Sequence, residues 1–328
     1  MKICLGIEST AHTFGIGIVD EKGNILANVK EVYTTKQGGI VPLEAAEHHE
    51  KVKEKVLKLA LEKAGIKLDD IDVVSFSQGP GLAPCLLKGL FLAKKLGKEL
   101  SIDLVPVNHC IAHLEIGKLL CKAKDPVMLY VSGANTQVIS YASKRYRVFG
   151  ETLDIGVGNF IDSFARYCGI GFPGGPKIEE LAKKSKNLVE LPYSVKGMDV
   201  AFSGLLTNLK QKYDKGYKLS DLAFSLQEYA FAMLTEVSER AMAFLRKEEL
   251  LLAGGVACNK RLQEMCKIMC KERNAKFFCP PNEFLVDNGA MIAWLGLLMF
   301  KANQKVKADE ADIAPYQRSD EVKVSWLN

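Results

Sequence analysis

The sequence has little of several features that mark specialised classes of protein. Its nine cysteines are an odd number and contain no C-x-x-C pair, so we expect reduced thiols rather than a disulfide framework. The longest uncharged apolar run, residues 290–300, has 11 residues, whereas a membrane helix needs roughly 18 or more. The opening residues MKICLGIEST hold no apolar stretch long enough for a signal peptide. We therefore expect a cytoplasmic protein without a membrane partner.

The chain also lacks a strong excess of charge of either sign. Lys and Arg number 44 and Asp and Glu 39, which gives a net charge of +5 in a chain of 328 residues. A protein that coats nucleic acid by itself is usually far more basic, so a phosphate-rich partner would be held at a local patch. The length predicts two domains, at roughly 150 residues for each.

Short apolar runs separated by turns predict an α/β fold. Three β-branched runs at the start, residues 3–7, 14–19 and 25–29, predict an antiparallel meander. A helix from Pro42 to about Lys63, a strand over residues 71–76, a glycine loop over 78–82 and a helix over 84–96 are expected next. The order of strand, glycine loop and helix is typical of α/β proteins.

A second hairpin repeats this opening about a hundred residues later. A strand over residues 127–131 runs into Ser132-Gly-Ala-Asn-Thr136 and returns over 138–141. The repeat predicts a duplicated α/β unit, with one domain over residues 1–125 and a second over 126–328. Further expected elements are helices at 156–168, 177–185 and 219–246, a strand–turn–helix unit at 249–269 and a last helix near 287–301. Turns of small residues after the strands expose backbone N–H groups, which suits a nucleotide held between the halves.

The string Asn108-His-Cys-Ile-Ala-His113 follows an expected strand over residues 104–107. On a helix, His109 and His113 point to one side, a spacing that lets both bind one metal ion. Asp287 and Tyr130 are candidates for further ligands, and a packed histidine pair is the alternative. Cys110 stands where the H-E-x-x-H metallopeptidases have their glutamate, which disfavours proteolysis.

Two carboxylates lie beside glycine-bearing segments. Asp162 follows Gly158, and Glu179 follows Gly174-Gly175-Pro176. An ionised carboxylate accepts hydrogen bonds from the hydroxyls of a ribose. The alternative is an acid that stabilises the start of a helix.

Ten strings of residues occur in order between Ile3 and Trp326: GIESTAHTFG, GGIVPLEAAEHH, SQGPGLAP, VNHCIAHLE, YVSGANT, FPGGP, VKGMDVAFSGLL, LLAGGVACNKRL, DNGAMIAW and RSDEVKVSW. Together they resemble the archaeal and eukaryotic branch of the tRNA threonylcarbamoyltransferases, which are KEOPS-complex relatives of bacterial TsaD. This resemblance implies the two-lobed actin/Hsp70/sugar-kinase (ASKHA) fold, in which the last helix packs back on the first lobe. It also implies transfer of a threonylcarbamoyl group from threonylcarbamoyl-adenylate to N6 of the adenosine 3′ of the anticodon, in tRNAs that read codons beginning with A.

The resemblance further implies which residues bind what. One divalent iron or zinc ion per chain would be held by His109, His113, Tyr130 and Asp287. Threonylcarbamoyl-adenylate, or ATP or AMP, would lie in the cleft against Tyr130, Val131, Ser132, Gly133, Ala134, Asp162, Gly175, Glu179 and Asn259. The implied partners are tRNA and the KEOPS subunits, namely a small atypical protein kinase, a dimerising subunit and a kinase-binding subunit. No nucleophilic side chain is assigned, because the reaction needs no covalent enzyme intermediate.

The sequence departs from the family pattern at positions outside the metal and adenylate sets. Val41 and Leu43 replace a histidine and a basic residue that are common there, and Leu87-Lys88 replaces Arg-Val. These changes put in doubt any role of those side chains in handling tRNA. The alternative functions are a metal-dependent glycoprotein endopeptidase and an ASKHA-type ATPase or switch.

Overall fold

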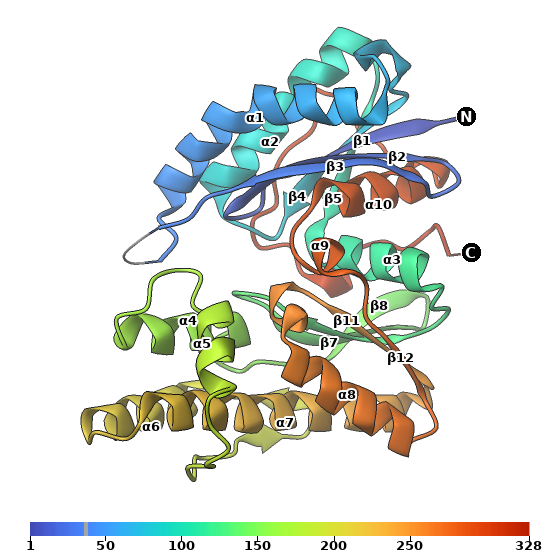
Figure 1. Cartoon of the computed structure of the whole chain (residues 1–328). Coiled ribbons are helices and arrows are strands. Elements are labelled where there is room, and N and C mark those ends of the chain that lie inside the picture. The colour runs from blue at the N-terminus through green and yellow to red at the C-terminus, as the bar shows by residue number, and fades with distance from the viewer. Residues whose placement is uncertain (36–38, 328) are drawn as a thin grey trace.

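Two five-stranded sheets with the same pattern of pairing form the framework of the chain (Figure 1). The computed structural model describes residues 1–35 and 39–327; residues 36–38, which include the first residue of the GGIVPLEAAEHH string, lie outside it, as does residue 328. The strand orders are β3-β2-β1-β4-β5 and β8-β7-β6-β11-β12. In each sheet the central strand pairs antiparallel with the next strand of the chain and parallel with a later one. The predicted duplicated α/β unit is confirmed.

The first sheet carries the predicted meander and two parallel strands. Its strands are β1 (Ile3–Glu8), β2 (Thr13–Asp20), β3 (Ile25–Val32), β4 (Val73–Gly79) and β5 (Leu104–Asn108). Helices α1 (Pro42–Ala64) and α2 (Ala83–Leu100) pack against one face of this sheet, with the short η1 (Leu68–Asp70) between α1 and β4. Helix α1 has Pro42 in its first turn and ends before Gly65, whose φ of 67° is the left-handed conformation that favours glycine.

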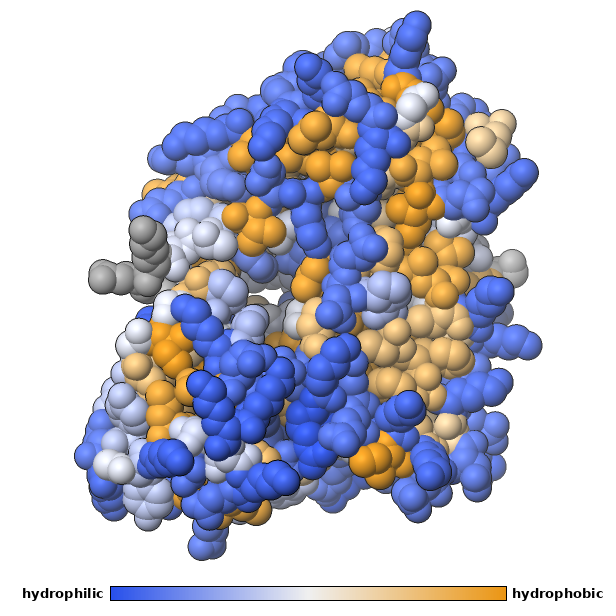
Figure 2. Space-filling view, viewed as in Figure 1, coloured by the Kyte–Doolittle hydropathy of each residue, from blue (hydrophilic) through white to orange (hydrophobic). Residues whose placement is uncertain are grey.

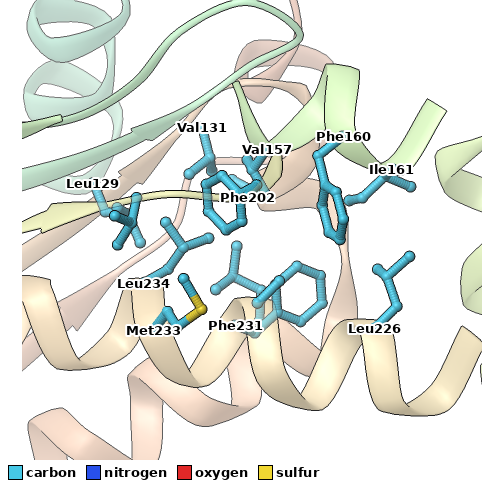
Figure 3. Close-up of a cluster of buried hydrophobic side chains, with 14 of the residues drawn as sticks. Leu129, Val131, Val157, Phe160, Ile161, Phe202, Leu226, Phe231, Met233 and Leu234 are labelled. Carbon is cyan, nitrogen blue, oxygen red and sulfur yellow. The ribbon is translucent and has the colours of Figure 1, made fainter. Parts of the chain in front are cut away.

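The second sheet consists of β6 (Val127–Val131), β7 (Thr136–Ala142), β8 (Arg145–Glu151), β11 (Glu249–Ala253) and β12 (Lys276–Phe278). A small ribbon is formed by β9 (Val195–Lys196) and β10 (Asp199–Val200). The accompanying helices are α4 (Val157–Tyr167), α5 (Gly175–Ala182), α6 (Ser203–Asp214), α7 (Leu219–Leu245), α8 (Lys260–Glu272) and α9 (Asn282–Leu285), with η2 (Gly255–Cys258) and, near the C-terminus, η3 (Ser319–Glu321). Apolar side chains of α4, α7 and β6 form the core of this half, as Figure 3 shows around Phe160, Phe202 and Phe231.

Helices α3 (His109–Cys121) and α10 (Gly289–Lys301) lie between the two sheets (Figure 1). Helix α10 crosses β1 and β2 at very short range. A Cβ atom at Gly6 would lie 2.1 Å from the backbone nitrogen of Ala293, and one at Gly17 would lie 2.1 Å from that of Ala290. Only glycine permits this approach. The last helix therefore packs on the first sheet, although the domain boundary after residue 125 stays a prediction.

Across residues 1–35 and 39–327, no helix combines the length and the apolar character needed to cross a membrane. All nine cysteines are free. Cys266 and Cys270 are buried in the apolar core between α7 and α8, which agrees with packing rather than metal binding.

Candidate functional site

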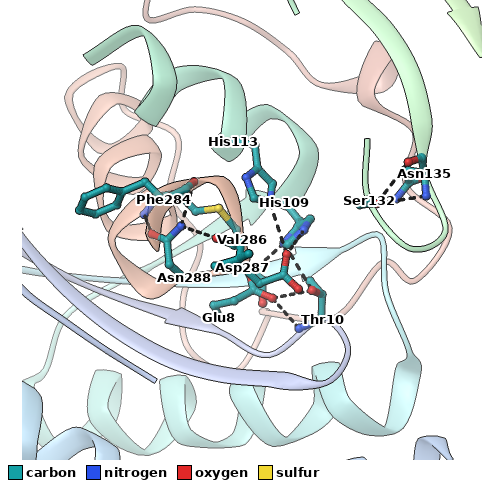
Figure 4. A network of polar contacts seen from close by, with 12 residues as sticks. Glu8, Thr10, His109, His113, Ser132, Asn135, Phe284, Val286, Asp287 and Asn288 are labelled. Atoms are coloured by element: carbon teal, nitrogen blue, oxygen red, sulfur yellow. Dashed lines mark hydrogen bonds and ion pairs between the residues drawn. The ribbon is translucent and has the colours of Figure 1, made fainter. Parts of the chain in front are cut away.

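Two imidazoles and a carboxylate meet at the end of the first sheet. Helix α3 begins directly after β5, and Asn108 caps it by accepting a hydrogen bond from the backbone of Ile111 at 3.1 Å. The Nε2 atoms of His109 and His113 both lie 3.4 Å from Oδ1 of Asp287 (Figure 4). The potential ligand atoms of these three residues lie within 4.8 Å of one another. The structure thus brings the histidine pair and Asp287 to one point.

Tyr130 lies beside this group at the end of β6. It is buried, and its ring centroid is 5.2 Å from that of His113. Burial raises the pKa of its phenol well above the usual value. The side chain is therefore protonated at neutral pH in the absence of a cation.

Glu8 fixes the orientation of His109. The Glu8 side chain is fully buried, and its Oε2 accepts a hydrogen bond from Nδ1 of His109 at 2.9 Å, while Oε1 accepts one from the backbone of Thr10 at 2.7 Å. With Nδ1 engaged, Nε2 of His109 faces Asp287. The sequence analysis did not include Glu8 in the site; the signal was a carboxylate that ends the otherwise apolar strand ICLGIE.

His113 is buried, and neither of its ring nitrogens forms a well-aligned hydrogen bond to the residues that the structure describes. Buried polar atoms without partners are rare. Two imidazoles and a carboxylate are a donor set that suits iron or zinc. The group therefore fits a metal ion better than it fits a packed histidine pair.

Charge interactions oppose the effect of burial on the acid and on one histidine. Burial by itself would raise the pKa of Asp287, but the charge of His109 and the close approach of both imidazoles hold it well below its ordinary range. Burial would lower the pKa of His109, yet the carboxylates of Glu8 and Asp287 raise it well above 6.5. Burial lowers the pKa of His113. A cation would here take the place of the proton on His109.

The predicted adenylate segment, residues 130–134, comprises the last two residues of β6 and the turn after it, and the turn contacts the start of α4. The carbonyls of Ser132 and Gly133 accept hydrogen bonds from the backbone of Gly158 at 3.0 Å and of Asn159 at 2.9 Å. Gly133 and Ala134 are exposed. On the other side, a Cβ atom at Gly254 would lie 2.3 Å from the carbonyl oxygen of Val131. Contacts with α4 and with Gly254 thus hold the backbone of this segment, while Gly133 and Ala134 remain open to solvent.

The other predicted adenylate residues form a second group. Oδ1 of Asp162 on α4 accepts a hydrogen bond from the backbone of Gly174 at 2.8 Å, and burial raises the pKa of this carboxyl. Glu179 on α5 accepts one from the backbone of Lys260 at 3.1 Å, next to Asn259 at the start of α8. A Cβ atom at Gly175 would meet nothing within 4 Å.

Both polar atoms of the Asn259 side chain are engaged: Oδ1 caps α8 by accepting a hydrogen bond from the backbone of Arg261 at 2.9 Å, and Nδ2 donates to Gln227 on α7 at 2.6 Å. The second group thus comes from α4, α5 and the start of α8, and consists of Asp162, Gly175, Glu179 and Asn259. It does not include the histidine pair. The ring of His12 is 5.7 Å from that of Phe172. Its charge counters the effect of burial on the pKa of both Asp162 and Asp287. In the space-filling view the surface is hollowed between the two halves, on the side of α4 and α5 (Figure 2).

Comparisons with known proteins point to one family. A family model described as "TsaD: tRNA N6-adenosine threonylcarbamoyltransferase" matches residues 24–294. The chain is 56% identical over 325 residues to the tRNA N6-adenosine threonylcarbamoyltransferase of Thermococcus kodakarensis, a match that covers 99% of both chains. It is 55% identical to a probable bifunctional tRNA threonylcarbamoyladenosine biosynthesis protein of Methanocaldococcus jannaschii, with 99% of this chain and 60% of that protein covered. The chain therefore spans about three fifths of the bifunctional relative.

Solved structures of low sequence identity share the fold. HypF of T. kodakarensis matches with a TM-score of 0.66 at 14% identity, over 92% of this chain and 48% of that one. Component A of the (R)-2-hydroxyglutaryl-CoA dehydratase of Acidaminococcus fermentans matches with a TM-score of 0.58 at 12% identity, over 90% and 98% of the two chains. Both are ASKHA-type proteins, so the predicted fold class is confirmed.

Proposed function

The chain belongs to the TsaD family of tRNA N6-adenosine threonylcarbamoyltransferases, and on this premise we propose that it transfers the threonylcarbamoyl group of threonylcarbamoyl-adenylate to tRNA. The acceptor is N6 of the adenosine 3′ of the anticodon in tRNAs that read codons beginning with A. The observation that carries the proposal is the convergence of His109, His113 and Asp287 beside the loop at residues 130–134 in a chain with this ancestry. The endopeptidase and ATPase alternatives have no comparable support.

We propose His109, His113, Asp287 and Tyr130 as ligands of one divalent iron or zinc ion. Among the described residues, the ring nitrogens of His113 form no well-aligned hydrogen bond, and both histidines approach Asp287 to 3.4 Å; these two observations support this set. Such an ion would supply a Lewis acid that polarises the threonylcarbamoyl group. Glu8 holds the imidazole of His109 with Nε2 toward Asp287, which presets the ring for coordination.

We propose that the adenylate lies against residues 130–134, with Asp162, Gly175, Glu179 and Asn259 around its nucleoside. The exposed Gly133 and Ala134 leave space for a phosphate, and the open side of Gly175 allows close approach of a ribose or base. Asp162 accepts a hydrogen bond from the backbone of Gly174, and Glu179 accepts one from the backbone of Lys260. Each therefore has lone pairs left for a ribose hydroxyl.

The proposed reaction is an acyl transfer in which positioning matters most. The bond that forms joins N6 to the carbamoyl carbon, the bond that breaks joins this carbon to the phosphate oxygen of the adenylate, and N6 gives up one proton. Because the lone pair of N6 is delocalised into the adenine ring, it is a poor nucleophile and must be held in line with an activated carbon. AMP leaves, and no side chain of the chain is acylated.

The proposed partners follow from the substrate and the resemblance. We propose tRNA as substrate and the KEOPS subunits as companions, in the cytoplasm: a small atypical protein kinase, a dimerising subunit and a kinase-binding subunit. A net charge of only +5 supports shared rather than solitary binding of tRNA. The two proposed lobes, residues 1–125 and 126–328, would close on the adenylate between them.

The test is product formation on a defined substrate. The purified chain, combined with its proposed partner subunits, is incubated with threonylcarbamoyl-adenylate and an unmodified tRNA that reads a codon beginning with A. The tRNA is then digested, and its nucleosides are identified by mass spectrometry. We expect threonylcarbamoyl-adenosine with this tRNA and none with a tRNA in which guanosine replaces the acceptor adenosine. Absence of the product from the first tRNA, under conditions in which the T. kodakarensis relative produces it, would refute the proposal.

A further inference from the structure

Tyr316 is a tyrosine side chain that packs against almost nothing. Its exposed fraction is 93%, the highest among the exposed large apolar and aromatic residues of the described ranges, where the next values are 69% for Phe244 and Met1. Exposure of an aromatic ring to this degree forgoes the free energy that burial of its apolar surface would give. The Tyr316 ring is therefore accessible to a binding partner.

The backbone that carries this ring is held on both sides. The backbone N–H of Ala314 donates a hydrogen bond to Gln78 at 2.8 Å, and that of Gly81 donates to the carbonyl of Pro315 at 3.1 Å. After Tyr316, the side-chain oxygen of Gln317 accepts a hydrogen bond from Nδ2 of Asn108 at 3.0 Å. The ring is therefore presented from a fixed support, which lowers the entropy lost when it binds.

These anchors place Tyr316 at the same edge of the first sheet as the candidate metal site. Gln78 lies at the end of β4, and Asn108 ends β5 directly before His109. The carboxyl ends of neighbouring parallel strands meet at one edge of a sheet. In Figure 1 the red C-terminal segment passes this edge on its way to the C-terminus.

A cationic residue, Arg318, follows Tyr316 two positions later in the chain. The side chain of Arg318 is 49% exposed, and its contacts with Glu151 at 3.5 Å and with Asp320 at 3.1 Å join partly exposed groups. Ion pairs of this kind contribute little stability, so the guanidinium can turn to a phosphate, with which it forms stronger bonds. An aromatic ring that accepts a base and a nearby arginine that accepts a phosphate form a recurrent arrangement for single-stranded nucleic acid.

We propose that Tyr316 stacks on an unpaired nucleobase of the tRNA anticodon loop and so positions the acceptor adenosine at the site. The inference rests on the proposed function and adds to it a residue that recognises the RNA. Tyr316 acts as a positioning residue, because it touches a neighbouring base rather than the reacting atoms. The stacking needs the ring and not its hydroxyl group.

The experiment compares Tyr316→Ala, Tyr316→Phe and Phe244→Ala with the unchanged chain, each assembled with the same partner subunits. Phe244 is a matched control because it is also an exposed aromatic, on α7 and against Phe149 of β8 in the second sheet. For Tyr316→Ala we expect the KM for tRNA to rise roughly 5-fold to 150-fold, the range that loss of one stacked base gives. The KM for threonylcarbamoyl-adenylate, the bound metal and the thermal stability should not change. Tyr316→Phe and Phe244→Ala should both retain the original KM for tRNA.

A second measurement separates this inference from the proposed function. An anticodon stem-loop that carries 2-aminopurine beside the acceptor position reports stacking by quenching of its fluorescence, whether or not transfer occurs. We expect quenching with the unchanged chain and with Tyr316→Phe, but not with Tyr316→Ala. Equal quenching and an equal KM for tRNA in Tyr316→Ala would overturn the inference, as would loss of a partner subunit from that variant in gel filtration. Absence of transfer by the unchanged chain would refute the proposed function instead.

Discussion

Oε2 of Glu8 lies 2.9 Å from Nδ1 of His109, although 101 positions of sequence separate the two residues. The first strand of the chain thereby orients a side chain on a helix that begins after the fifth strand. This contact links the opening hairpin to the candidate metal site, and it accounts for a buried carboxylate at the end of an apolar strand.

Replacement of Glu8 tests this link. In Glu8→Gln the carboxylate charge is lost while the size of the side chain is kept, so His109 loses its charged partner and its preferred orientation. We expect the affinity for iron or zinc to fall about 10-fold to 100-fold, as is typical when a residue that supports a ligand is changed. Titration with zinc in a competitive chelator measures the effect. The exposed Glu47→Gln is the control and should bind like the unchanged chain; equal affinity in both variants would contradict the role of Glu8.

Removal of a ligand should have a larger effect. In His113→Ala and in Asp287→Asn we expect metal content after dialysis to drop below stoichiometric amounts and transfer to fall by at least about 100-fold. Elemental analysis and the tRNA assay measure the two quantities on the same preparation. His48→Ala, which changes a half-buried histidine on α1, should keep both. Full metal occupancy in both ligand variants would refute the assignment.

The buried His49 predicts a pH dependence of stability. Burial, with a smaller effect of the neighbouring His48, lowers the pKa of His49 to about 4 from 6.5. Between these values the unfolded chain binds a proton that the folded chain does not, so the free energy of unfolding decreases as the pH falls through this window. The decrease from this one group is about 2 to 3 kcal/mol.

Urea unfolding at about pH 7 and at about pH 5 checks this expectation. His49→Phe keeps an aromatic ring against Phe14, whose centroid lies 5.5 Å from that of His49, and removes the titrating group. The loss of stability between the two pH values should therefore be smaller in this variant than in the unchanged chain. An identical loss in both proteins would show that His49 does not cause the decrease in the free energy of unfolding at low pH.

Because α10 crosses the first sheet so closely, we expect that no residue larger than glycine can occupy position 17 without destabilising the fold. An added Cβ atom would overlap the backbone of Ala290, and backbone atoms on both sides cannot move as the end of a side chain can. We expect Gly17→Ala to lower the free energy of unfolding by at least about 3 kcal/mol, at the upper end of overpacking effects. Gly204→Ala is the control, because a Cβ atom there meets nothing within 4 Å. Similar stability of the two variants would disprove the close approach.

The sequence predicted the parts of this molecule that depend on local patterns. The hairpins, the helix starting at Pro42 and the histidine pair on a helix after a strand are all present. Helix α6, β8 and β12 were not predicted, because their short or mixed patterns acquire an apolar face only through contacts distant in sequence. The strand expected over residues 71–76 begins at Val73 and continues to Gly79.

The site was predictable to the extent that spacing or family resemblance names its residues. The i, i+4 spacing places His109 and His113 together, but no pattern in the sequence states that Asp287, 174 positions after His113, completes the group. Glu8 was missed because its role depends on the pairing of β1 with β4 and of β4 with β5. Tyr316 was missed because exposure of a ring in an irregular segment leaves no periodic signal.

The central claim is that this chain, through the site built around Asp287, attaches a threonylcarbamoyl group to tRNA. The most direct test follows radiolabelled threonine, within threonylcarbamoyl-adenylate, into acid-precipitable tRNA in a single turnover with the assembled complex. The account predicts stoichiometric label in tRNA with the unchanged chain, in the nucleoside 3′ of the anticodon, and almost none with Asp287→Asn. Label that stays in the adenylate with the unchanged chain, or that reaches tRNA equally with Asp287→Asn, would contradict it.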